Sequence, residues 1–425
     1  MIQNKFKESD VDWIGKIPEH WKVVKVKDAF FRKNAKAKNP NPVILTLSRE
    51  SVKIRDISNN DGQIAEDYSN YNPVSIDDIL LNPMDLISGD NCNISRVEGV
   101  ISPAYINLRY KKGVNPEYYN LFFKYMYWSK VMFAHGKGVS FDNRWTLNYE
   151  ILSNLKIPLP PKKEQNLIAD FLLKKIETIY AIQKSISIEI KTLEDYKKSI
   201  ITEAVTKGLD RDVPMKDSGI EWIGEIPDHW QIKKLKYIAD TICKGISPSY
   251  TEEELVPVIN QASFSQGYLN KDFQYCNDDA NSDAKLNYGD VLLATTGGGV
   301  LGKSFYFEEE GDYLASTDVA FIRTNNLNLS KFIYYIFSVN YDLFNGEFAK
   351  GSTNQTHLQM NLLSNMMLPL PSNSEIIKIV EYLDRLMINI ENIINQKQVQ
   401  IQSLEEYKKS LIYEYVTGKK EVGRG

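Results

Sequence analysis

Two stretches of the chain carry an apolar residue at every third or fourth position, with charged residues between them. They cover residues 162–207 and 372–418, and neither contains proline or, before its end, glycine. This spacing places apolar side chains on one face of an α-helix. Because a helix of about 40 residues is about 60 Å long, the pattern predicts two helices too long to lie on one small domain.

The apolar positions of both helices follow a heptad seam, which predicts that they pack on each other as an antiparallel coiled coil within one chain. The predicted seam residues are Leu172, Ile176, Ile179, Ile186, Ile190 and Leu193 in the first helix, and Leu383, Met387, Ile390, Ile394, Ile401 and Leu404 in the second. Polar residues interrupt the seam at Gln183, Lys197, Lys397 and Lys408. The alternative is that each helix packs only on its own neighbouring domain.

The segment before each long helix alternates short apolar runs with turn residues, which is typical of β-strands. We expect strands within 23–26, 43–47, 79–81, 104–110, 256–260, 291–295 and 319–323, and helices over 116–133 and 329–344. The predicted fold class is therefore α+β, with two mixed α/β domains separated by two long helices.

The whole pattern occurs twice. Residues 13–21 (WIGKIPEHW) return as 222–230 (WIGEIPDHW) at an offset of 209, and residues 193–201 return as 404–412 at an offset of 211. Such agreement indicates a unit of about 210 residues in pseudo-twofold tandem repeat. The predicted divisions are two mixed domains at 1–160 and 209–371, their helices at 161–208 and 372–418, and a tail at 419–425.

Composition narrows the class of protein without identifying a partner. The chain has 425 residues, 43% hydrophobic and 25% charged, as expected of a globular protein with two or three domains. Its formal net charge of −4 requires any nucleic-acid surface to be local. No apolar run long enough for a membrane span or signal peptide occurs, so a cytoplasmic location is expected. The cysteines, Cys92, Cys243 and Cys276, lack metal-ligand spacing, so no metal is expected.

The duplicated Trp-Ile-Gly motifs at 13–15 and 222–224, and the Pro-Leu-Pro motifs at 158–160 and 369–371, carry a resemblance over the full length. The chain resembles the specificity subunits of type I restriction–modification systems. Glu164-Gln165 and Glu375 stand where that family begins its conserved-region helices, although the second copy has Ile376 in place of glutamine.

The resemblance implies a non-catalytic subunit with two target recognition domains, each reading one half of a bipartite asymmetric site in double-stranded DNA. It implies two methyltransferase subunits docked on the helices, and restriction subunits in the full complex, as partners. S-adenosylmethionine, ATP and Mg are expected on those partners, and no cofactor on this chain. Ile188, Ile201 and Leu386, outside the seam, are candidate contacts to the methyltransferase, or they cover the recognition domains.

A polar loop precedes each Pro-Leu-Pro motif, and its residue types suit base reading, because Arg pairs with guanine and Asn or Gln with adenine in the major groove. The candidate DNA-binding residues are Lys137, Ser140, Asn143, Arg144, Lys303, Lys350, Ser352, Thr353, Asn354 and Gln355. Candidate phosphate contacts are Lys22, Lys25, Lys33, Lys36, Lys233 and Lys234. Ordinary turns and a solvated charged surface are the alternatives.

Gly297–Ser304 also fits the pattern G-x-x-x-x-G-K-S of a phosphate-binding loop. Such a loop needs a helix beginning at its Lys-Ser, whereas Phe305-Tyr306-Phe307 has the pattern of a strand. A P-loop nucleotide-binding protein is therefore the weaker alternative, and a coiled-coil interaction protein is the third.

Overall fold

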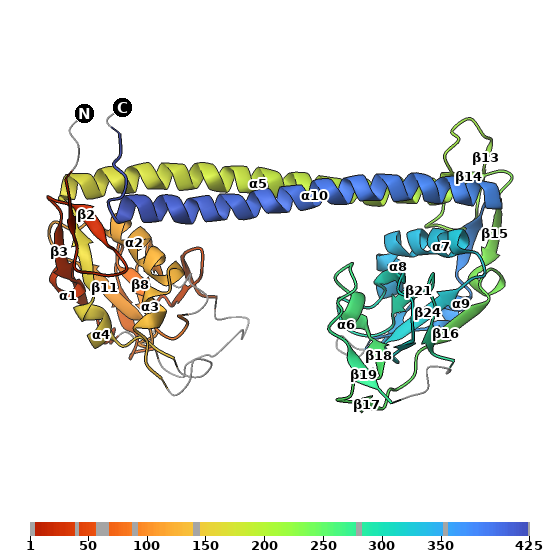
Figure 1. Ribbon diagram of the computed structural model, residues 1–425, viewed down its shortest axis with the longest axis horizontal. Helices are drawn as coiled ribbons and strands as arrows, with labels where there is room; N and C mark the ends of the chain where they lie inside the picture. Colours follow the sequence, from red (N-terminus) through yellow and green to blue (C-terminus); the bar gives the residue numbers. More distant parts are fainter. Residues whose placement is uncertain are drawn as a thin grey trace. The chain divides into compact units, whose positions relative to one another are not determined.

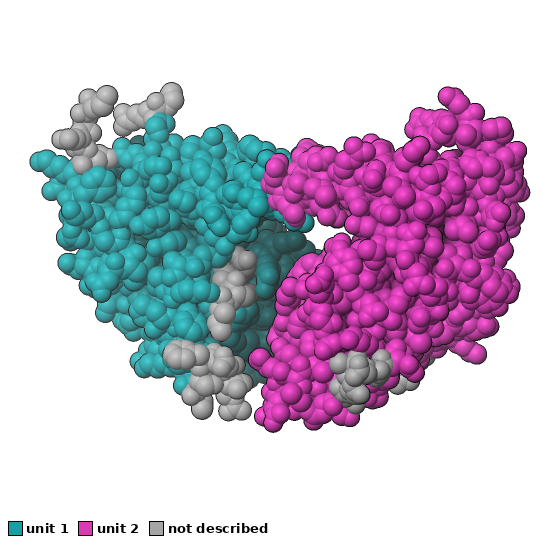
Figure 2. Space-filling model, turned by 45° about the vertical axis from the view of Figure 1, so that its right-hand side comes forward, with its two compact units in different colours: residues 1–187, 398–425 teal, residues 188–397 magenta. Residues whose placement is uncertain are grey.

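The computed structural model describes residues 5–38, 42–56, 68–86, 92–138, 145–277, 283–351 and 356–423. The chain forms two compact units, which Figure 2 shows in different colours: unit 1 is residues 1–187 with 398–425, and unit 2 is residues 188–397. Each unit contains one mixed domain and part of each of two long helices, α5 (Lys162–Lys207) and α10 (Asn373–Val416). The bounds of α5 are those expected from the apolar spacing, and those of α10 differ by one residue at its start and two at its end.

The domain of unit 1 is built from short strands and helices (Figure 1). Its elements are β1 (Phe6–Glu8), β2 (Lys16–Pro18), β3 (Lys22–Lys25), α1 (Val26–Ala29), β4 (Phe30–Arg32), β5 (Leu45–Leu47), β6 (Val52–Ile54), β7 (Asn72–Val74), β8 (Ile79–Leu81), β9 (Cys92–Ile94), β10 (Gly99–Ile101), β11 (Ile106–Tyr110), α2 (Pro116–Trp128), α3 (Val131–Ala134), α4 (Tyr149–Asn154) and β12 (Lys156–Leu159).

The domain of unit 2 has a closely similar order of elements. They are β13 (Met215–Asp217), β14 (Glu225–Pro227), β15 (Gln231–Lys234), the 3-10 helix η1 (Leu235–Tyr237), β16 (Thr241–Lys244), β17 (Tyr250–Thr251), β18 (Val256–Ile259), α6 (Gln261–Phe264), β19 (Gln274–Cys276), β20 (Lys285–Leu286), β21 (Val291–Ala294), β22 (Ser304–Tyr306), β23 (Tyr313–Ala315), β24 (Val319–Arg323), α7 (Leu327–Val339), α8 (Tyr341–Asn345), β25 (Ala349–Lys350), β26 (His357–Leu358), α9 (Met360–Ser364) and β27 (Met367–Leu370).

The two domains share the topology of their central sheets, although unit 2 also has a five-stranded sheet, β17-β19-β18-β23-β20, where unit 1 has the two-stranded sheets β10-β7 and β5-β6. Each has a four-stranded antiparallel sheet, in the order β4-β11-β8-β9 in unit 1 and β16-β24-β21-β22 in unit 2. The strand at each Pro-Leu-Pro motif pairs with a strand near the start of its own domain, as β12 with β3 and β27 with β15. The predicted α+β fold with a tandem repeat is therefore confirmed.

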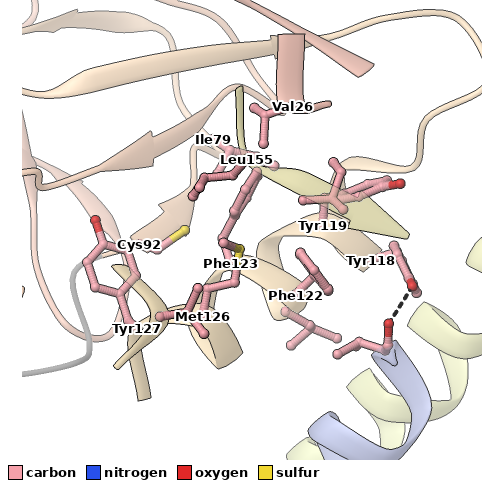
Figure 3. Close-up of a cluster of buried hydrophobic side chains, with 14 of the residues drawn as sticks. Val26, Ile79, Cys92, Tyr118, Tyr119, Phe122, Phe123, Met126, Tyr127 and Leu155 are labelled. Carbon is pink, nitrogen blue, oxygen red and sulfur yellow. Dashed lines mark hydrogen bonds between the residues drawn. The ribbon is translucent and has the colours of Figure 1, made fainter. Parts of the chain in front are cut away.

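The core of unit 1 lies where helix α2 meets the four-stranded sheet and the long helices (Figure 3). Asn115 begins the helix by accepting hydrogen bonds from the N–H groups of Glu117 and Tyr118, with Pro116 in its first turn. Phe122 and Phe123 are fully buried in this core. The Tyr118 hydroxyl donates to the carbonyl of Val416 at 2.7 Å, so the end of α10 is fixed to the first domain.

Two helices that the sequence pattern predicts as continuous are each divided. The one over 116–133 breaks at Lys130, whose φ of +61° lies in the left-handed region that a continuing α-helix excludes. The one over 329–344 begins two residues earlier and stops at Asn340, whose side-chain amide donates to the carbonyl of Ile336 at 2.7 Å. The expectation of single helices was wrong because apolar spacing does not register such local backbone changes.

The long helices pack antiparallel within each unit. In unit 1 the first turns of α5 and the last turns of α10 share one core, and the Gln183 amide donates to the carbonyl of Ile401 at 3.3 Å. In unit 2, Lys197 lies 2.5 Å from Glu391 across the pair. Six predicted seam residues are buried, namely Leu172, Ile179, Ile186, Leu383, Met387 and Ile390, and six are half-buried, namely Ile176, Ile190, Leu193, Ile394, Ile401 and Leu404. The predicted antiparallel coiled coil is therefore confirmed, and the helices do not pack on their own domains alone.

Candidate nucleic-acid interface

The polar loops before the Pro-Leu-Pro motifs leave the two domains at equivalent places. The first is closed by backbone hydrogen bonds between Lys137 and Thr146, and the second by the pairing of Lys350 with His357. The next residue in each case donates its N–H to the end of an equivalent strand, Leu147 to the carbonyl of Pro83 at 2.9 Å and Leu358 to that of Thr295 at 2.8 Å. Both loops therefore start from the same corner of the repeated sheet.

The two lysines at the bases of these loops, Lys137 and Lys350, are exposed, as phosphate contact requires. The other loop candidates lie outside the described residues, namely Ser140, Asn143, Arg144, Ser352, Thr353, Asn354 and Gln355. DNA binding by these residues, and base reading by Asn143, Arg144, Asn354 and Gln355 among them, stays a prediction.

The lysines near the start of each domain have different surroundings. Lys22, Lys25, Lys36 and Lys233 are exposed, and Lys234 is half-buried. Lys33 lies 2.8 Å from the fully buried carboxylate of Asp78 and donates to the Ser75 hydroxyl at 2.9 Å. Because Lys33 is held inside its own domain, it is the phosphate candidate least suited to reach DNA.

The glycine-rich loop of unit 2 is not a phosphate-binding loop. Strand β22 begins at Ser304, directly after the lysine of the motif, where such a loop needs a helix. The Lys303 ammonium donates to the carbonyl of Ser265 at 2.7 Å, within its own domain. The loop therefore lacks the helix on which the nucleotide-binding alternative depends, and the DNA contact predicted for Lys303 stays a prediction.

A buried ion pair recurs in the two sheets, and sequence reasoning missed it. The carboxylates of Asp78 and Asp290 are both fully buried and precede equivalent strands, β8 and β21. Arg109 donates a hydrogen bond to the Asp78 carboxylate at 3.1 Å. Two nitrogens of Arg323 donate to the Asp290 carboxylate at 2.7 and 2.8 Å. Burial raises the pKa of Asp290, while hydrogen bonds from Arg323 and Asn287 oppose that rise. Each pair joins the start of one central strand of the four-stranded sheet, β8 or β21, to its neighbour β11 or β24.

A second repeated contact joins each domain to the start of its own long helix. Glu164 accepts from the Trp21 indole at 2.8 Å and lies 2.7 Å from the His20 ring. In unit 2, Glu375 accepts from Trp230 at 3.0 Å and lies 2.8 Å from the ring of His229. The sequence repeats all three residue types at matching positions in both copies, so the signal for this contact is present in the sequence.

The pKa of Glu375 shows how strongly this contact favours the carboxylate. Burial alone raises that pKa, but hydrogen bonds from Ser372, Trp230 and His229 outweigh it and lower the pKa to about 2. The ionised glutamate therefore holds α10 against the second domain at neutral pH.

Neither a membrane span nor a metal cluster is found in the part of the chain that the structure describes. No helix there is long and apolar enough to cross a membrane. The same residues contain no group of three or more His, Cys, Asp or Glu side chains placed to hold a metal ion.

Comparison with known proteins gives consistent matches over both repeats. The sequence model of the type I restriction modification DNA specificity domain matches residues 18–192 and 227–403. The chain is 27% identical to the type I restriction enzyme MjaVIII specificity subunit of Methanocaldococcus jannaschii, covering 95% of this chain and 94% of that protein. It is 30% identical to the putative MjaX specificity subunit of the same organism, over 63% of this chain and 65% of that protein.

Solved structures share the fold at low sequence identity. A chain from a study of complex assembly and conformational transition of the type I R-M system matches with a TM-score of 0.69 and 16% identity, covering 94% of this chain and 98% of that one. The HsdS subunit from Thermoanaerobacter tengcongensis matches with a TM-score of 0.51 and 15% identity, covering 95% of this chain and 98% of that one.

Proposed function

Because the chain belongs to the type I restriction modification DNA specificity family, we propose that each of its two recognition domains reads one half of a bipartite asymmetric DNA site. The observation that carries this proposal is a repeated frame with different loops. The sheet order, the buried ion pair and the hydrogen bond at the loop base recur in both domains. The loop sequences at 137–146 and 350–357 differ. Two equivalent readers with different side chains suit two different half-sites.

The long helices dock two methyltransferase subunits in this proposal. Exposed apolar residues recur at equivalent positions of the two helices, 211 residues apart: Ile182 and Ile393, Ile188 and Val399, and Tyr196 and Tyr407. An exposed apolar surface on a helix favours packing by a helix of a partner. Because the surface is present twice, two copies of one partner fit it.

Of the three residues suggested as methyltransferase contacts, only Ile188 remains well exposed. Ile201 is buried in the core of unit 2, and half-buried Leu386 packs against that core. Both residues therefore pack against the second recognition domain, which is the alternative to methyltransferase contact given for them above. Their apolar character is explained by the fold of unit 2.

Chemistry belongs to the partners in this proposal. The methyltransferase subunits hold S-adenosylmethionine, and the restriction subunits use ATP and Mg. The assembly acts on the cell's own DNA, so we place the chain in the cytoplasm. This chain supplies sequence choice and the platform that joins the subunits.

The test is to co-express the chain with its methyltransferase subunit in a host without other adenine methylation and to map methylated adenines by sequencing. The proposal expects methylation confined to one bipartite, asymmetric motif, and co-purification of two methyltransferase subunits per chain. A stable complex that methylates no adenine, or methylates adenines without regard to sequence, would contradict it. If the chain captures no methyltransferase subunit, the docking part of the proposal fails.

A further inference from the structure

A group of polar side chains lies beside the loop base in unit 2. The Thr296 hydroxyl is 2.7 Å from Oδ1 of Asp318 and 3.1 Å from Oε1 of Gln261. Thr296 also forms a backbone bridge with His357, the residue that closes the polar loop. The side chains of Thr296, Asp318 and Gln261 come from three places in the chain and meet at one corner of the sheet, where the backbone of His357 joins them.

The hydrogen bonds inside this group leave capacity for a ligand. A hydroxyl has one proton, so Thr296 donates to only one of its two acceptors at a time. Within the described residues, Oδ2 of Asp318 and the Nε2 amide of Gln261 have no hydrogen-bond partner. Asp318 and Gln261 are both half-buried, and His357 is exposed, so the group is open on one side.

The equivalent positions in unit 1 share the hydrogen bond at the loop base and the strand pairing, and they carry different side chains. Thr296 directly follows Thr295, whose carbonyl accepts the hydrogen bond at the loop base. Met84 holds the same position after Pro83 in unit 1. Asp318 lies two residues before Ala320, which pairs with Leu293. In unit 1, Ala104 lies two residues before Ile106, which pairs with Leu81. Exposed Met84 and Ala104 offer neither a carboxylate nor an amide. At this corner the two domains therefore have a similar backbone but present different side chains.

A carboxylate at this place needs an explanation if the corner meets DNA, since phosphates repel it. The exocyclic amino groups of cytosine and adenine are the donors that DNA presents in the major groove, and a carboxylate accepts from them. The glycines beside the group allow close approach, because Gly297 has a φ of +91° and a Cβ there would lie 3.0 Å from the Gln261 amide.

We propose that Asp318, positioned by Thr296 and flanked by Gln261, reads an exocyclic amino group of cytosine or adenine in the half-site of the second recognition domain. This inference rests on the proposed function and assigns base reading to residues outside the polar loops. Asp318 is the acceptor, the Gln261 amide donates to an adjacent base, and Lys350 contacts a phosphate beside them. The first domain, with Ala104 in place of Asp318, reads its half-site without this contact.

The test compares the complex of the wild-type chain and its methyltransferase subunits with the same complex carrying Asp318→Asn, which keeps the shape and replaces an acceptor by a donor. Methylated adenines are mapped as above, and relative binding is measured on duplexes with one base pair replaced at a time. Asp342→Asn is the matched control, because it removes the same charge from unit 2 where Asp342 faces Lys198 of α5 at 3.2 Å. Thermal unfolding shows whether each variant folds.

We expect the complex with Asp318→Asn to discriminate the correct base pair from the others about ten- to a hundredfold less well at one position of the site. That pair lies in one half of the motif, it identifies the base as cytosine or adenine, and the other half is unchanged. Unchanged discrimination at every position would overturn the assignment of Asp318, and so would a uniform loss across both halves in a folded variant. A wild-type complex with no motif would refute the proposed function itself, a result distinguishable from failure of this inference alone.

Discussion

The contact between Glu375 and the second domain gives a quantitative prediction. Its carboxylate accepts from the Ser372 hydroxyl at 2.6 Å, besides the contacts to Trp230 and His229. The pKa falls from an ordinary 4.5 to about 2. At about 1.4 kcal/mol for each unit of pKa, this lowering corresponds to at most about 3 kcal/mol of folding stability. Because the side chain is 32% exposed, solvent screening reduces this to about 1–2 kcal/mol.

Glu375→Gln removes the charge and keeps the shape, so we expect it to destabilise this contact by about 1–2 kcal/mol at pH 7. Since the folded pKa is lowered, the stabilisation is fully present above about pH 4.5 and is lost as the pH falls through 2. The difference between variant and wild type should therefore shrink in acid. Amide hydrogen exchange followed by mass spectrometry measures this locally, which suits a chain with two compact units.

The expected result is exchange about five- to thirtyfold faster in peptides around Trp230 and the first turns of α10, with unit 1 unchanged. Glu381→Gln is the matched control, because Glu381 is an exposed acid on the same helix. If exchange at these peptides is the same in Glu375→Gln and wild type at pH 7, the Glu375 carboxylate does not hold α10 against the second domain.

Three further predictions address the core, the buried ion pair and the docking surface. Leu172→Ala should destabilise unit 1 by about 2–5 kcal/mol, because Leu172 is fully buried, while Leu173→Ala should cost under about 1 kcal/mol; urea unfolding compares them. Arg323→Met leaves Asp290 buried without its partner and should cost about 3 kcal/mol, so equal thermal unfolding of variant and wild type would argue against a stabilising pair. Ile188→Asp should lower methyltransferase capture at least tenfold in co-purification without changing thermal unfolding, because Ile188 is 58% exposed.

The features that the sequence predicted well depend on long, regular patterns. The bounds of α5 follow from helical spacing over 46 residues without proline or glycine, and the duplicated motifs predict the tandem repeat. Each rests on many residues at once, so no single local exception changes the result.

The features that it missed depend on single contacts between distant residues. The pairing of Asp290 with Arg323 joins two strands, and nothing in local composition gives that partner. Lys33 looked like a phosphate contact because sequence gives its charge, and the structure gives its neighbour, Asp78. The group around Asp318 was missed for the same reason, because its members are brought together only by the sheet.

An exchange of one domain shows whether each recognition domain reads its own half of the site. Residues 13–160 are replaced by the corresponding domain of a related specificity subunit with a known motif, and methylated adenines are mapped in the resulting complex. If each domain reads its own half, one half of the motif changes to that of the donor while the other half stays as in the wild-type complex. A motif changed in both halves, or in neither, would contradict it.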